Sequence, residues 1–151
     1  MSLNKLNQLY RLVILDHATN SHHHYEISHP TNKKLLHNTS CGDTVKISFN
    51  VDSEGIITDI GFVGQGCTIS QASASILTDT MQGKQKDEAL ELVKIFSDIA
   101  KGSERSPEDV AKLGDAQVLT NIMEFPARIK CATLAWWAFQ EAFLPEENEV
   151  E

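Results

Sequence analysis

The fold of this chain is decided by residues 41–67, which read CGDTVKISFNVDSEGIITDIGFVGQGC. Apolar residues at positions 45, 47, 49 and 51 alternate with polar ones, which is typical of a half-buried strand over residues 44–51. The stretch Asp52-Ser53-Glu54-Gly55 predicts a turn, and residues 56–63 predict a second strand. We therefore expect an antiparallel hairpin that has a cysteine on each side, Cys41 before it and Cys67 after it.

Helices are predicted on both sides of this hairpin. The apolar spacing predicts helices over residues 3–19, 68–82 and 86–101. Ser106-Pro107 is a typical helix start, and it predicts a short helix that ends near Gly114. A short helical piece follows around Leu119, and a last helix runs from about Pro126 to near residue 144. The small residues at 70–75 predict close packing of their helix against another backbone.

Two polar stretches are predicted to lie outside the regular elements. Residues 20–38 hold five of the six histidines and are expected to form a loop, and the acidic residues 146–151 a disordered tail. Strands followed by helices, without βαβ alternation, are typical of the α+β class. We expect one domain over residues 1–145: a small antiparallel sheet of about three strands, with helices packed on one face.

Composition disfavours several classes of function. The chain has 151 residues and a net charge of −8, which disfavours binding to nucleic acid or to an anionic membrane surface. No stretch is long and apolar enough to span a bilayer, and the N-terminus lacks a signal-peptide pattern. Three cysteines cannot all pair with one another within one chain. A cytoplasmic protein with reduced cysteines is expected.

The cysteines are the candidate functional residues. Cys41, Cys67 and Cys131 each lie where a turn meets a regular element, and three thiolates with one carboxylate would complete a tetrahedral metal site. Asp43 is two residues after Cys41, so an extended chain places both side chains on one face. The positive end of the following helix favours the thiolate form of Cys67. Free cysteine is also a common core residue, and the spacing alone leaves both interpretations open.

A second group of candidate ligands is the run His22-His23-His24, together with His29 and His37. Histidine clusters bind zinc, copper or nickel. The spacing of this run would not fold it around an ion, which favours a solvated polar loop.

Three motifs, in order, carry a resemblance that covers almost the whole chain. They are Cys41-Gly42-Asp43, the segment GQGC at 64–67 with its Ser/Ala-rich helix, and FPARIKC at 125–131. With them the chain resembles the iron–sulfur cluster assembly family that includes IscU and the NifU N-terminal domain, and most closely its SufU branch. Lys130 stands where IscU-type scaffolds have histidine, the motif Leu-Pro-Pro-Val-Lys is absent, and residues 103–117 form an extra region. These departures match the SufU pattern.

The resemblance implies a zinc-containing sulfur acceptor. It implies that Cys41, Asp43, Cys67 and Cys131 are the zinc ligands, that Cys41 accepts persulfide sulfur and that Arg128 contacts the partner. The implied partners are a SufS-type cysteine desulfurase and, downstream, the Suf cluster-assembly complex. Two alternatives stay open: a scaffold for a transient [2Fe–2S] cluster or iron, and a purely structural zinc domain. Whether the protein is an enzyme, a zinc-dependent sulfurtransferase, or a carrier also stays open.

Overall fold

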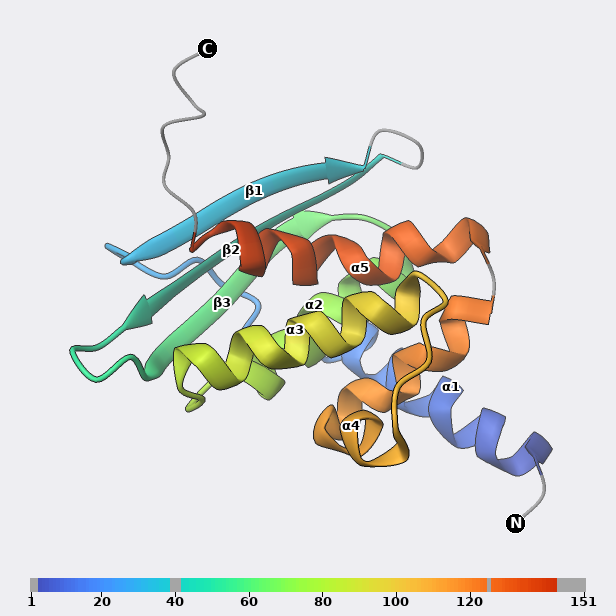
Figure 1. The fold of residues 1–151 in the computed structure, drawn as a ribbon. Helices are drawn as coiled ribbons and strands as arrows, with labels where there is room; N and C mark the ends of the chain where they lie inside the picture. Colours follow the sequence, from blue (N-terminus) through green and yellow to red (C-terminus); the bar gives the residue numbers. More distant parts are fainter. Residues whose placement is uncertain (1–2, 39–41, 125, 144–151) are drawn as a thin grey trace.

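The computed structural model describes residues 3–38, 42–124 and 126–143, and within them a three-stranded antiparallel sheet has helices packed on one face (Figure 1). This confirms the predicted α+β class. The elements, in chain order, are α1 (Leu3–Thr19), β1 (Asn32–Asn38), β2 (Asp43–Val51), β3 (Ile57–Gln65), α2 (Thr68–Met81), α3 (Lys86–Ala100), α4 (Pro107–Lys112), the 3₁₀ helix η1 (Gly114–Glu124) and α5 (Pro126–Glu141).

The predicted hairpin is formed by β2 and β3. Ile47 pairs with Phe62 and Phe49 with Ile60, and all four side chains are at most 1% exposed. The alternation seen in the sequence therefore places one face of the hairpin in the core. The turn is closed by Asp52, whose carboxylate accepts hydrogen bonds from two backbone N–H groups of residues 54 and 56.

The prediction of a loop throughout residues 20–38 was wrong for its second half. Residues Asn32–Asn38 form β1, which pairs antiparallel with β2 at the edge of the sheet. Alternate residues of β1 face inward, but among them only Leu36 is apolar, so the sequence shows no hydrophobic alternation. The strand is stabilised by its ladder to β2 and by its contacts with α5. The Asn32 side chain also donates to the carbonyl oxygen of Ala142, which directly follows α5.

Helices α2 and α5 cover the inner face of the sheet (Figure 1). Helix α5 contacts β1 and β2, α2 contacts β3, and α1 packs on α2 rather than on the sheet. The small residues of α2 allow it to approach α5 closely, as predicted. The buried hydroxyl of Ser73 donates to the carbonyl oxygen of Ala132 at 2.6 Å and accepts from the indole N–H of Trp136 at 3.1 Å.

Residues 20–31, called here the 20–31 segment, lie against the outer edge of β3 and the outer face of the sheet. The carbonyl oxygen of His23 accepts from the backbone N–H of Phe62, and the N–H of Ile27 donates to the buried hydroxyl of Ser48. Gly61 makes room for this segment, because a Cβ atom there would lie 2.2 Å from the carbonyl oxygen of Tyr25. The outer face of the sheet is therefore partly covered.

The predicted short helices lie at the lower right of Figure 1 as α4 and η1. The predicted start of α4 is confirmed, because the Ser106 hydroxyl accepts from the backbone N–H of Asp109 at 3.1 Å. Within the described residues, no helix has both the length and the apolar content needed to cross a bilayer. The predicted disordered tail, residues 146–151, lies outside the described residues.

Candidate metal centre

Three of the four predicted ligands come together between the sheet and the helices. One ligand atom each from Asp43, Cys67 and Cys131 lies within 4.8 Å of the others. Asp43 is the first residue of β2, Cys67 precedes the first residue of α2 and Cys131 lies in the second turn of α5. The hairpin and the packing of α2 on α5 therefore join segments that are far apart in the sequence.

The carboxylate of Asp43 is held in one orientation. It is 1% exposed, and its Oδ1 atom accepts a hydrogen bond of 3.1 Å from the backbone N–H of Cys67. Gly66 leaves the space that this carboxylate occupies, because a Cβ atom at Gly66 would lie 2.5 Å from Asp43 Oδ1. Such contacts to a ligand side chain fix its direction toward a metal ion.

The two described cysteines differ in exposure. Cys131 is buried at 1% exposure, whereas Cys67 is half-buried. Cys67 occupies the N-cap position of α2, and no side-chain capping bond forms there. Next to Cys131, the carbonyl oxygen of Ala132 accepts a hydrogen bond from the hydroxyl of Ser73, which ties this part of α5 to α2.

The remaining predicted site residues are only partly placed. Cys41 lies outside the described residues, and its assignment as ligand and sulfur acceptor stays a prediction. Asp43, two residues further along the chain, is at the site. Arg128 is exposed on the first turn of α5, three residues before Cys131, so the two residues lie on neighbouring positions of one helix face. Its contact with a partner stays a prediction.

The donor set fits a zinc ion. Thiolate sulfur and carboxylate oxygen are both zinc ligands, and structural zinc sites commonly have four ligands. Asp43, Cys67 and Cys131 supply three ligand atoms within the distance given above. Thiolates are also the ligands of iron–sulfur clusters, so the donor set alone does not separate the two cofactors.

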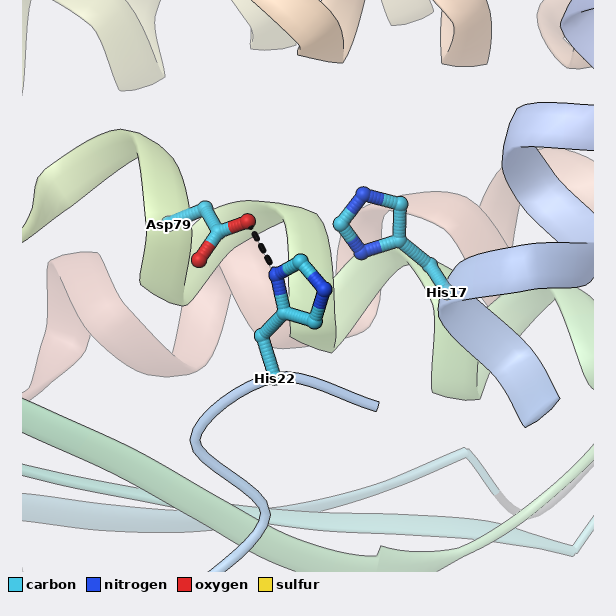
Figure 2. A group of neighbouring side chains, drawn as sticks. All are labelled: His17, His22 and Asp79. Atoms are coloured by element: carbon cyan, nitrogen blue, oxygen red, sulfur yellow. Dashed lines mark hydrogen bonds and ion pairs between the residues drawn. The ribbon is translucent and has the colours of Figure 1, made fainter. Parts of the chain in front are cut away.

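A second group of ligand atoms lies at the other end of α2. Figure 2 shows the side chains of His17, His22 and Asp79 directed toward one another, and one ligand atom of each lies within 4.8 Å of the others. The sequence singled out His22 but not Asp79, which is 57 residues further along the chain. His22 and His24 are exposed, as predicted for a polar loop, yet the loop is hydrogen bonded to α2.

Comparison with known proteins places the chain in a family. The family model described as "NifU-like N terminal domain" matches residues 9–132, so the chain belongs to that family. A Streptococcus pyogenes protein named "Iron-sulfur cluster assembly scaffold protein IscU" is 44% identical, over 98% of this chain and 91% of that protein. A Bacillus subtilis protein named "Zinc-dependent sulfurtransferase SufU" is 41% identical, over 98% of this chain and 99% of that protein.

The fold agrees with this assignment. The crystal structure of a putative iron–sulfur cluster assembly scaffold protein for the SUF system from Fervidobacterium islandicum matches with a TM-score of 0.77 and 31% identity. That match covers 86% of this chain and 93% of the other. The resemblance to the IscU, NifU and SufU proteins is confirmed, and with it a place in iron–sulfur cluster assembly.

Proposed function

We propose that this protein is a zinc-containing sulfur acceptor of iron–sulfur cluster biogenesis. It takes persulfide sulfur from a SufS-type cysteine desulfurase and passes it to the Suf cluster-assembly machinery. The observation that carries the proposal is the convergence of Asp43, Cys67 and Cys131. The relative named as a zinc-dependent sulfurtransferase, 41% identical over nearly the whole of both chains, supports it.

In this proposal, Cys41, Asp43, Cys67 and Cys131 hold the zinc ion. Bound zinc supplies positive charge without redox chemistry, which keeps thiols deprotonated and does not oxidise them. The bond from the Cys67 amide and the space at Gly66 orient Asp43 for this role. The ion would join β2, α2 and α5, so its binding should stabilise the folded state.

The acceptor step is a thiol–disulfide-type exchange at Cys41. The Cys41 thiolate attacks the outer sulfur of the desulfurase persulfide, the S–S bond of that persulfide breaks, and the desulfurase cysteine leaves as a thiolate. Cys41 thereby becomes the persulfide. The transferred sulfur is already at the oxidation level of the product, so no further oxidant or reductant is needed. Arg128, exposed close to the site, would contact the desulfurase.

A scaffold for a transient [2Fe–2S] cluster is the second candidate function. The relative named as an IscU scaffold is 44% identical, and the same thiolates could bind iron. In that case the same residues would be cluster ligands, and the protein would gain iron and acid-labile sulfide on anaerobic reconstitution.

The first experiment is native mass spectrometry of the untagged, freshly purified protein. Zinc without iron favours the sulfur acceptor, whereas iron with acid-labile sulfide favours the scaffold. The zinc protein is then incubated with a cysteine desulfurase and cysteine, and the expected product is a mass increment of one sulfur on a peptide containing Cys41.

The Cys41→Ser variant tests the assigned acceptor. We expect it to receive no sulfur, and sulfur acceptance at the wild-type rate would refute the role of Cys41. A wild-type protein that binds zinc but never gains sulfur would instead indicate a purely structural zinc domain.

A further inference from the structure

The second group of ligand atoms brings together three separate parts of the chain. His17 lies in the last turn of α1, His22 in the 20–31 segment and Asp79 in the last turn of α2. Figure 2 shows the two imidazole rings and the carboxylate facing one another, with the His22 ring between the other two side chains. Two imidazoles and one carboxylate form a ligand set found in zinc and non-haem iron sites.

The surroundings of His17 are those of a metal-binding histidine. The ring is 5% exposed, and its Nδ1 atom lies 2.8 Å from the hydroxyl of Ser75. Histidine ligands commonly bind a second group through the other ring nitrogen, and this bond fixes the ring orientation. Ser75 also accepts from the backbone N–H of His22 at 2.8 Å. One buried hydroxyl on α2 therefore positions both histidines.

The carboxylate of Asp79 is oriented by two histidines. Its Oδ2 atom lies 2.5 Å from Nδ1 of His22, and its Oδ1 atom lies 3.4 Å from Nδ1 of His23. The ring of His23 is also held by α2, since its Nδ1 atom lies 3.1 Å from the hydroxyl of Thr78. The carbonyl oxygen of His23 binds the backbone N–H of Phe62 on β3. The 20–31 segment is thus hydrogen bonded to both α2 and β3 before any ion is present.

We propose that His17, His22 and Asp79 bind a divalent transition-metal ion at a second site, separate from the cysteine site. Cys67, at the N-cap of α2, and Asp79, in its last turn, are 12 residues apart, which corresponds to about 18 Å along the helix axis. This distance excludes a ligand shared between the two sites. The proposal does not depend on the sulfur-transfer function, because its ligands and its test are different.

The geometry needs only a small rearrangement to bind an ion. In a tetrahedral site with bonds of about 2.0–2.1 Å, ligand atoms lie about 3.3 Å apart. The present ligand atoms lie within 4.8 Å of one another, so no distance between two of them has to shorten by more than about 1.5 Å. The side chains of His22 and Asp79 are 44% and 31% exposed and can make that movement, while the buried ring of His17 stays in place.

Zinc titration of the untagged protein, already loaded at the cysteine site, tests the proposal. We expect a second equivalent of Zn²⁺ by calorimetry and native mass spectrometry. In ¹H–¹⁵N spectra of the histidine rings, the signals of His17 and His22 should shift while that of His37 does not. Absence of a second equivalent, or unchanged ring signals of His17 and His22, would overturn the proposal without any variant.

Three variants and one control locate the ion. We expect His22→Asn and Asp79→Asn each to weaken the second equivalent by at least about 100-fold, and Ser75→Ala by about 10- to 100-fold. The zinc at the cysteine site, retained in all three, reports that each variant is folded.

The matched control is His29→Asn. His29 is exposed, lies in the same segment and, like His23, has a φ of 57°. It should bind the second equivalent as the wild type does. Equal weakening in this control, or second-site affinity within about twofold of wild type in His22→Asn, would refute the assigned ligands.

Discussion

Replacement of Gly66 by alanine tests whether the orientation of Asp43 matters for zinc. An alanine Cβ atom would lie 2.5 Å from Asp43 Oδ1 and 2.3 Å from Ser70 Oγ. Because non-bonded heavy atoms pack at about 3.5 Å, the carboxylate would have to withdraw by about 1 Å. Ligand positions in zinc sites vary by only about 0.2 Å. The substitution should therefore displace the carboxylate of Asp43 while the side chains of all four proposed ligands remain.

We expect Gly66→Ala to weaken zinc binding by about 10- to 100-fold, or about 1.4–2.8 kcal/mol. This is the loss expected for a residue that orients a ligand rather than being one. The assay is competition between the protein and a chromophoric zinc chelator. The comparison is repeated in a Ser70→Ala background, which removes the collision with the serine hydroxyl and leaves the one with Asp43.

The matched control is Gly102→Ala. Among the described residues, no atom lies within 4 Å of a Cβ at Gly102, but its φ of +90° disfavours alanine. This variant should lose about 1–2 kcal/mol of stability and keep its zinc affinity. If Gly66→Ala binds zinc within twofold of wild type in both backgrounds, the inference that Asp43 is a positioned ligand is refuted.

Three further predictions concern packing, pH and the partner. Ser73→Ala should lower the free energy of unfolding, measured with urea, by about 1–3 kcal/mol, because it leaves the buried indole N–H of Trp136 without its acceptor. Burial lowers the pKa of His17 from its usual 6.5, so the unfolded chain takes up the proton more readily than the folded one. The contribution of His17 to stability is therefore complete above pH 6.5 and is lost as the pH falls. With chelator present, the free energy of unfolding of His17→Gln should fall less between pH 7 and pH 5 than that of the wild type. Arg128→Ala should weaken desulfurase binding, measured by calorimetry, with zinc content unchanged, whereas Lys94→Ala, an equal change of charge on α3, should not.

Local sequence patterns predicted most of the regular elements. The alternation of residues 45–51 identified β2, and the Ser106 cap identified the start of α4. Both patterns can be read within a few residues, although the alternation in β2 reflects burial of one face against α5, far along the chain. Strand β1 was missed because an edge strand with Lys34 and Asn38 facing inward owes its stability to its neighbours. Those neighbours, β2 and α5, lie outside residues 32–38, so the pattern within the strand does not reveal them.

The site was predictable only in part for the same reason. The cysteine motifs are local, and with the family resemblance they led to Asp43, Cys67 and Cys131 as neighbours. The grouping of His17 and His22 with Asp79 depends on the packing of α1 on α2 and on the path of the loop between them. Neither is encoded in a spacing that can be read along the chain.

The 20–31 segment also has a consequence for association. An unprotected sheet edge offers N–H and C=O groups to a strand of another molecule, which is a common route to aggregation. At the β3 edge, the backbone N–H of Phe62 already donates a hydrogen bond to the carbonyl oxygen of His23. At the β1 edge, Lys33 and Lys34 place charges that disfavour a neighbouring strand. Both borders of the sheet thus resist strand addition, so the proposed partner or a second copy should dock through side chains rather than by extending the sheet.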